Sequence, residues 1–104
     1  MKRVKRRYLA LKVESESVPT EREFIDAIWG SVTRLYGEVG ASQTGLCLID
    51  FNVEKKVGVV RTSLSSLGMV RSSVATVTSL AGKAASLQVL TISGTLKSLF
   101  SSIK

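Results

Sequence analysis

The spacing of apolar residues along this chain switches between the period of a strand and that of a helix, and the order of the switches predicts the fold. Residues 7–14 alternate between apolar and other side chains, which predicts a strand. Thr20 and Glu23 have the spacing of a capping box, and a helix is expected from there until Gly37 and Gly40 end it. The apolar stripe of this helix consists of Phe24, Ile25, Ile28, Trp29, Val32, Leu35 and Tyr36.

The second half of the chain repeats this switching. Residues 45–51 and 56–62 predict two strands, and the few polar residues between them predict a hairpin. A second helix is expected over residues 63–81, closed by a glycine, because apolar residues recur there three and four positions apart. A fourth strand over 86–93 and a short last helix over 95–103 complete the order.

This order predicts an α+β fold of the ferredoxin-like β-α-β-β-α-β type, with a four-stranded antiparallel sheet and an added C-terminal helix. We expect a basic arm over residues 1–6 and one domain over residues 7–104, because a chain of 104 residues suits a single core.

Strict alternation predicts a sheet that is apolar on both faces. Phe51 would share a face with Ile49, and Ile92 would share a face with Leu90. Such a sheet needs a second cover, supplied in part by the last helix and in part by a partner protein. The second helix also carries only one charge, Arg71, which favours an interface there. The residues expected at a protein interface are Leu67, Val70, Val74, Val77, Leu96, Leu99 and Phe100.

The charges are segregated along the chain. Residues 1–13 hold six bases and no acid, residues 14–54 hold all eight acids with two bases, and residues 55–104 hold seven bases and no acid, for a net charge of +7. Segregation of this kind suggests one basic surface facing a polyanion, although a solvated basic tail without a partner is the alternative. The bases expected to contact RNA are Lys2, Arg3, Lys5, Arg6, Arg7, Lys12, Lys55, Lys56, Arg61 and Lys97.

Several kinds of chemistry are not expected. The sequence has no histidine, and a single cysteine, Cys47, allows neither an intrachain disulfide nor a multi-cysteine zinc site. Recognition of stacked bases is not expected either, since the first strand offers only Tyr8 and the third has no aromatic residue. We expect phosphate contacts instead, with no active site in the chain. No apolar run could span or anchor in a membrane, so a cytoplasmic protein is expected.

Short motifs follow one another in order from about residue 6 to residue 100. They are Arg7-Tyr8-Leu9, Ala27-Ile28-Trp29, Leu35-Tyr36-Gly37-Glu38-Val39-Gly40, Val57-Gly58-Val59-Val60-Arg61 and Ser93-Gly94-Thr95-Leu96-Lys97. In their order and spacing they resemble the archaeal ribonuclease P protein component 2 family. Its eukaryotic relative is a subunit of ribonuclease P and of the mitochondrial-RNA-processing ribonuclease.

The resemblance implies a subunit of the ribonucleoprotein that removes 5′ leaders from precursor tRNA. Catalysis there belongs to the RNA and its magnesium ions, so no cofactor is expected in this chain. The implied partners are the catalytic RNA, protein component 3 and a second copy in a heterotetramer, with precursor tRNA as the holoenzyme's substrate. Because a long basic C-terminal extension is lacking, we expect the arm and Lys55, Lys56, Arg61 and Lys97 to carry the RNA contacts.

Two other hypotheses for the function remain open at this point. Ferredoxin-like folds often serve as regulatory modules that bind a small ligand or a metal, and the loop over residues 37–45 is the candidate pocket. The chain could also be an assembly factor that contacts protein and never RNA.

Overall fold

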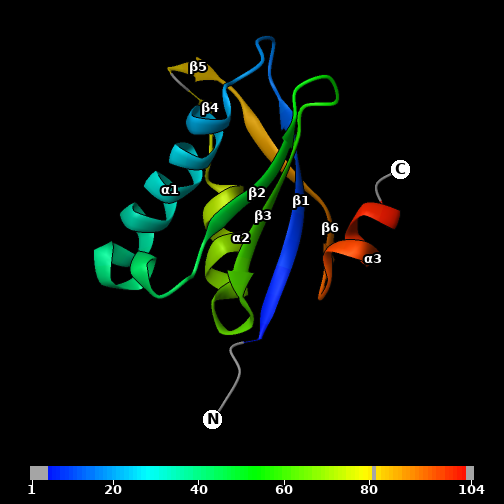
Figure 1. The fold of residues 1–104 in the computed structure, drawn as a ribbon. Coiled ribbons are helices and arrows are strands. Elements are labelled where there is room, and N and C mark those ends of the chain that lie inside the picture. The colour runs from blue at the N-terminus through cyan, green and yellow to red at the C-terminus, as the bar shows by residue number, and fades with distance from the viewer. Residues whose placement is uncertain (1–4, 81, 103–104) are drawn as a thin grey trace.

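The computed structural model describes residues 5–80 and 82–102. Four strands form an antiparallel sheet in the order β2-β3-β1-β6, α1 and α2 cover one face of it, and α3 lies on the other (Figure 1). We call these the helix face and the α3 face. The elements are β1 (Arg6–Glu14), α1 (Glu21–Ser42), β2 (Cys47–Asn52), β3 (Val57–Ser63), a 3-10 turn η1 (Leu64–Ser66), α2 (Leu67–Ala75), β4 (Ser79–Leu80), β5 (Lys83–Ala84), β6 (Ser86–Ser93) and α3 (Leu96–Ser102). The predicted ferredoxin-like fold is confirmed.

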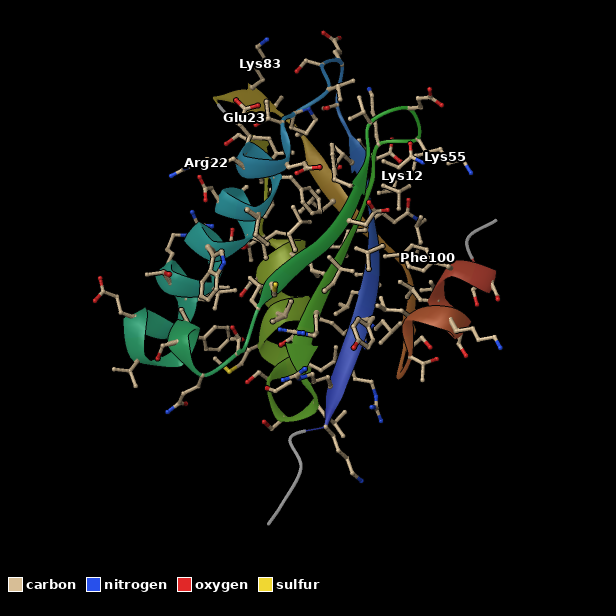
Figure 2. The ribbon with its side chains drawn as sticks, viewed as in Figure 1. Lys12, Arg22, Glu23, Lys55, Lys83 and Phe100 are labelled. Atoms are coloured by element: carbon tan, nitrogen blue, oxygen red, sulfur yellow. The ribbon has the colours of Figure 1, made fainter. Side chains whose placement is uncertain are left out.

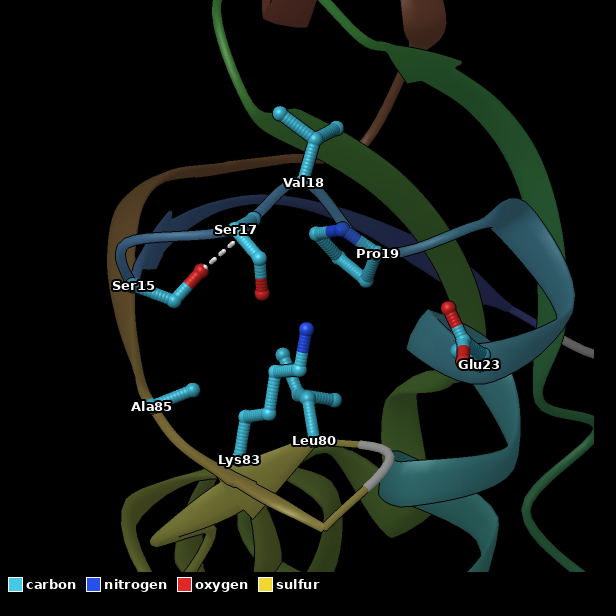
Figure 3. Close-up of a pocket in the computed structure, with 8 residues that line it drawn as sticks. All are labelled: Ser15, Ser17, Val18, Pro19, Glu23, Leu80, Lys83 and Ala85. Atoms are coloured by element: carbon cyan, nitrogen blue, oxygen red, sulfur yellow. Dashed lines mark hydrogen bonds between the residues drawn. The ribbon is translucent and has the colours of Figure 1, made fainter.

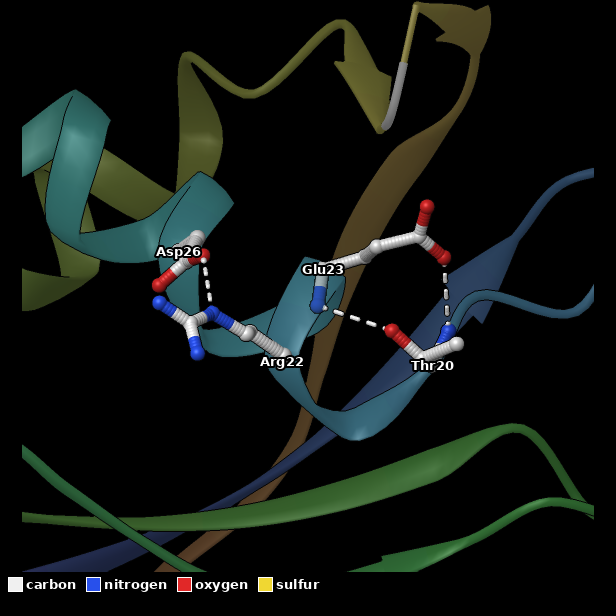
Figure 4. A network of polar contacts seen from close by, with 4 residues as sticks. All are labelled: Thr20, Arg22, Glu23 and Asp26. Carbon is white, nitrogen blue, oxygen red and sulfur yellow. Dashed lines mark hydrogen bonds and ion pairs between the residues drawn. The ribbon is translucent and has the colours of Figure 1, made fainter.

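The start of α1 follows the predicted capping box. The amide of Glu23 donates to Thr20 Oγ1 at 3.1 Å, and a carboxylate oxygen of Glu23 accepts from the amide of Thr20 at 2.8 Å (Figure 4). The predicted end is only partly right. Gly37 interrupts the helix with φ of 76°, but helical residues then continue past Gly40 to Ser42.

The interruption leaves part of the predicted apolar stripe in solvent. Phe24, Ile28 and Val32 are fully buried, whereas Leu35 and Tyr36, next to Gly37, are 45% and 40% exposed. The helix therefore packs along its first three turns, exposes apolar side chains around the kink, and packs again at Ala41, which is buried in the main core.

The second helix is shorter than predicted. It ends at Ala75, and the chain then forms a small hairpin of β4 and β5 in which Gly82 has φ of 80°. Val77 and Leu80 are still buried, at 5% and 4% exposure, but Val77 lies in the turn after α2 and Leu80 in β4. The β-branched run Thr76-Val77-Thr78 disfavours another helical turn, and spacing alone cannot tell the two conformations apart.

The main core lies between the sheet and the two long helices. Leu9 and Leu11 from β1 and Val60 from β3 pack with Phe24 from α1 and Val70 from α2. Phe24 lies so close to β3 that a Cβ on Gly58 would stand 2.4 Å from its ring. Only a glycine fits at that position without movement of the ring.

Two irregularities in the strands make the predicted faces of Phe51 and Ile92 wrong. The register shifts between Leu48 and Asp50 in β2, and β6 has one extra residue, Leu90, opposite the step from Ala10 to Leu11. Each extra residue turns the rest of its strand over, as a β-bulge does. Phe51 and Ile92 therefore join the main core, and Leu90 is left 42% exposed.

The α3 face carries a second, smaller apolar cluster. Its buried members are Ala10, Val59 and Leu99, and the half-buried Tyr8, Ile49, Val57 and Leu96 pack around them. The last helix therefore covers part of this face, as predicted, through one fully buried leucine.

Candidate nucleic-acid interface

Four bases meet at the end of the sheet where β1 begins, and we call Lys5, Arg6, Arg7 and Arg61 the arm end. The antiparallel pairing of β1 with β3 brings them together: Arg6 lies opposite Ser63, and Tyr8 lies opposite Arg61. The amide of Leu64 also donates to the carbonyl of Lys5 at 2.8 Å. Lys5 and Arg6 are exposed, and Arg7 and Arg61 are half-buried.

Arg7 is partly used inside the fold. One of its guanidinium nitrogens, Nη1, donates to the carbonyl of Arg6 at 2.9 Å, and it lies 3.4 Å from where a Cβ on Gly94 would stand. The side chain of Arg7 therefore lies across the segment that leaves β6. Lys5, Arg6 and Arg61 make no side-chain hydrogen bond or ion pair within the part of the chain that the structure describes.

A second group, the hairpin end, consists of Lys12, Lys55 and Lys56 near the turn between β2 and β3 (Figure 2). The amide of Val13 donates to the carbonyl of Lys56 at 2.8 Å, which joins β1 to this turn. Lys12 and Lys55 are exposed. Arg6 and Lys12 are six positions apart along β1, which is about 20 Å of extended chain.

Lys56 has a structural role within the turn. Its backbone has a positive φ of 55°, and its ammonium Nζ donates to the carbonyl of Ser15 at 2.6 Å. The structure thus separates Lys55 and Lys56 from Arg61, although sequence reasoning had grouped them. Lys56 and Arg61 are five positions apart, joined by four residues of β3.

Acids accompany only one of the two ends. Glu14, Glu16 and Glu54 lie on the strand end and turns around the hairpin end. The strand segments of the arm end, residues 5–8 and 59–63, contain none. By register the nearest acid on β2 is Asp50, which is opposite Val59, one step further into the sheet.

The remaining predicted RNA contacts lie elsewhere. Lys97 is exposed in the first turn of α3, four residues after Ser93, which pairs with Tyr8. Lys2 and Arg3 lie outside the described residues.

Acids of α1 lie on the opposite side of the molecule from α3. Between residues 5–80 and 82–102 the only ion pair joins Arg22 Nε to Asp26 Oδ2 at 3.5 Å (Figure 4). Both side chains are well exposed, so this pair contributes little to stability. None of the cations at the arm end or the hairpin end is neutralised by a carboxylate in this way.

The residues predicted for a protein interface fall into two groups. Val70, Val74, Val77 and Leu99 are buried in this chain's own clusters, so they have no surface to offer in this structure. Leu67 and Leu96 are half-buried, and Phe100 is 38% exposed.

Sequence reasoning missed an exposed apolar group around the kink of α1. Its members are Leu35, Tyr36 and Val39. The signal that could have revealed it is Gly37 directly after Tyr36, because a residue with positive φ ends the packed part of a helix.

A small pocket lies between the β1–α1 loop and the β4–β5 hairpin, and the ammonium of Lys83 points into it (Figure 3). Ser17 and Glu23 help to line it, and the hydroxyl of Ser15 donates to the carbonyl of Ser17. Its volume of about 140 Å³ is below the several hundred Å³ of typical ligand sites. Its lining includes no residue of the 37–45 loop, where the regulatory-module reading placed a ligand.

The chemistry available to the chain is limited. No group of three or more histidine, cysteine, aspartate or glutamate side chains is placed to hold a metal ion among the residues described. Cys47, opposite Arg61 in the sheet, has no histidine in the chain to act as its base. No helix within the described ranges is long and apolar enough to cross a membrane.

Fold and surface together define a small ferredoxin-like protein with one strongly basic end and no assembled catalytic group among its described residues. Comparison with known families identifies it further. The sequence model of the Rpp14/Pop5 family matches residues 7–104, and the chain belongs to this family.

Curated relatives agree with that assignment. Ribonuclease P protein component 2 of Pyrococcus furiosus is 35% identical over 97 residues, which cover 93% of this chain and 81% of that protein. The protein of the same name from Methanosarcina mazei is 33% identical over 95 residues, covering 91% and 80%. These matches confirm the resemblance seen in the short motifs and place the chain among ribonuclease P protein subunits.

The fold has a counterpart in a known assembly. A chain in the cryo-EM structure of yeast ribonuclease MRP superposes with a TM-score of 0.70, covering 92% of this chain and 79% of that chain. The two sequences are only 18% identical, so this likeness bears on the fold.

Proposed function

We propose that this chain is an RNA-binding subunit of ribonuclease P that supports the active fold of the catalytic RNA during removal of 5′ leaders from precursor tRNA. In this proposal the RNA and its magnesium ions perform the hydrolysis, and the chain contributes neither a catalytic residue nor a cofactor. The observation that carries the proposal, beside family membership, is the arm end, where cations gather without a carboxylate partner among the described residues.

The physical effect of such a subunit is electrostatic. Each lysine or arginine that contacts a phosphate releases condensed counterions, and it screens repulsion between RNA segments that must lie close together. Tyr8 is half-buried against the cluster on the α3 face, so only part of its ring is accessible for stacking on β1. The contacts would therefore position the RNA backbone and would not read its bases.

We also propose a protein partner, ribonuclease P protein component 3, and association of two copies of this chain within the particle. The exposed Phe100, the partly exposed Leu67 and Leu96, and the apolar group at the α1 kink are surfaces that could be covered. Exposed apolar side chains that lie together are typical of protein interfaces.

Reconstitution tests the proposed function. Catalytic RNA and component 3 are mixed with precursor tRNA, with and without this chain, and the rate of 5′-leader removal is measured at several magnesium concentrations. We expect the chain to raise the rate and to lower the magnesium requirement, because its cations replace part of the ionic screening. Equal rates with and without the chain would contradict the proposal.

A matched control for that assay changes charges on the other side of the molecule. The variant Arg22→Gln with Asp26→Asn removes the exposed ion pair of α1 without altering the net charge. We expect it to stimulate cleavage as the wild type does.

The exposed apolar group at the α1 kink favours one second candidate, an assembly factor that contacts only protein. Ultraviolet crosslinking in the reconstituted particle separates the two. Crosslinks from RNA to the arm end support the RNA-binding subunit, and their absence together with full assembly supports the assembly factor.

A further inference from the structure

Resting on the proposed function, we infer that RNA docks at the arm end of the sheet and not at the hairpin end, and that this end takes the sugar–phosphate backbone of paired RNA. Both ends carry bases that sequence reasoning treated alike. The structure separates them by about 20 Å along β1 and surrounds them differently.

The first difference is net charge. At the hairpin end Glu14, Glu16 and Glu54 lie near the three lysines and the neighbouring Lys83, so most of the positive charge there cancels at a distance. At the arm end four bases share strand segments that contain no acid. A polyanion is therefore attracted to the arm end far more strongly.

The second difference is availability. The ammonium of Lys56 donates to the carbonyl of Ser15. Of the three lysines at the hairpin end, only Lys12 and Lys55 therefore make no side-chain hydrogen bond in the described structure. At the arm end Arg7 is partly engaged, but Lys5, Arg6 and Arg61 make no side-chain hydrogen bond in the described structure.

The third difference is the repulsion between like charges at the arm end. Arg6 and Arg61 point to the same face of neighbouring strands as diagonal neighbours, since Arg61 is opposite Tyr8 and Arg6 lies two residues before it. Diagonal neighbours are about 7 to 8 Å apart, and like charges at such positions oppose folding. Asp50, opposite Val59, is a diagonal neighbour of Arg61 on the other side and offsets part of this repulsion, but one acid stands against the four bases of the arm end, and an anionic partner would balance the rest.

The type of RNA follows from what the arm end lacks. Proteins that hold single strands stack bases on exposed aromatic rings. Tyr8 is half-buried in the cluster under α3, while the exposed aromatics, Tyr36 and Phe100, lie at the α1 kink and on α3. An arm end with several guanidinium and ammonium groups and a single, half-buried ring suits the backbone of paired RNA, which proteins recognise by shape.

Two triple variants with the same change in charge test the inference. The arm-end variant is Lys5→Gln, Arg6→Gln and Arg61→Gln. The control is Lys12→Gln, Lys55→Gln and Lys83→Gln, three exposed lysines at or beside the hairpin end. Affinity for a fully paired RNA hairpin is measured for wild type and both variants over a series of potassium chloride concentrations.

We expect the arm-end variant to reduce the slope of log affinity against log salt by about 2 to 3, since each phosphate contact contributes a little under one. The control should change that slope by less than about one. An equal or larger change in the control, or an unchanged slope in the arm-end variant, would overturn the inference.

Thermal unfolding at low salt separates docking from structure. We expect the arm-end variant to melt at the same temperature as wild type or higher, because it removes repulsion. A lower melting temperature together with weaker binding would assign these side chains to the fold and overturn the inference.

A single-stranded oligouridine of the same length provides the last arm of the test. Weaker binding to it than to the hairpin supports contact with paired RNA, and tighter binding overturns that part. The proposed function can fail while the docking inference holds. That outcome is a wild-type chain that does not change the rate of leader removal, although the arm-end variant still lowers the salt dependence of hairpin binding.

Discussion

The two faces of the sheet differ in how firmly they are covered. On the helix face, side chains from all four strands of the sheet pack with α1 and α2, and Phe24 lies against the backbone of Gly58. On the α3 face a seven-residue helix rests on Ala10 and Val59 mainly through Leu99. Both clusters contain fully buried residues, but only the first joins elements from most of the chain.

This difference indicates which part of the molecule decides global stability. A helix of seven residues is not stable alone, so α3 depends on its contact with the sheet. Its loss would uncover a small area and leave the main core intact. We therefore expect α3 to open locally at lower free energy than the rest of the fold.

The largest effect is expected at the centre of the helix face. Phe24→Ala removes a fully buried ring that contacts Phe51 at a centroid distance of 5.1 Å. We expect it to lower the free energy of unfolding by about 3 to 5 kcal/mol. Urea unfolding followed by far-ultraviolet circular dichroism measures this free energy. A loss under about 1 kcal/mol would contradict the conclusion that the helix face decides global stability.

The next effect tests the close approach of α1 to β3. Gly58→Ala places a methyl group against the ring of Phe24, and we expect a cost of about 3 kcal/mol from overpacking. The same change in a Phe24→Leu background should cost at least about 1 kcal/mol less, because the clash is relieved. Equal costs in both backgrounds would show that the ring is not responsible.

A smaller global effect is expected on the α3 face. Leu99→Ala removes the one fully buried side chain of α3, and we expect a loss of about 2 kcal/mol, at the low end for such a change. Hydrogen exchange should show faster exchange of α3 amides with little change in α1. Equal acceleration in both helices would mean that the two faces form one cooperative unit.

The smallest effects are expected at the N-terminal caps of α1 and α3, which can be compared through the same substitution. Thr20 Oγ1 accepts from the amide of Glu23 in α1, and Thr95 Oγ1 accepts from the amide of Ser98 in α3 at 3.2 Å. We expect Thr20→Ala to lower the global free energy of unfolding by about 1 kcal/mol. Thr95→Ala should cost less by urea unfolding, since α3 can detach first, and a larger global loss for it would reverse the comparison.

Sequence-based predictions are confirmed where the structure of a segment depends only on residues close together in the chain. The capping box at Thr20 and Glu23, the alternation of β1 and the stripe formed by Phe24, Ile28 and Val32 are of this kind. The candidate bases could be listed from the sequence as well. Their division into an arm end and a hairpin end could not, because it depends on the register of β1 against β3.

The errors have a shared physical origin. Phe51 and Ile92 were placed on the wrong face because a bulge adds one residue, and strand pairing decides where it occurs. The second helix was extended too far because Val77 and Leu80 bury equally well from a helix or from extended chain. Helical spacing predicts Leu35 and Tyr36 in the core, but the kink at Gly37 interrupts the regular helix and leaves both side chains exposed.

The sequence alone predicts the order of the four main strands and three helices, the ferredoxin-like class, the family and a polyanionic partner. Each of these follows from periodicity, local capping, charge or short motifs, which need no knowledge of what lies opposite in space. Only the tertiary structure decided which bases lie together, which of them are already used and which acids lie near them. Those relations arise from strand register and bulges, since a charge acts on its neighbours in space and not on its neighbours in the chain.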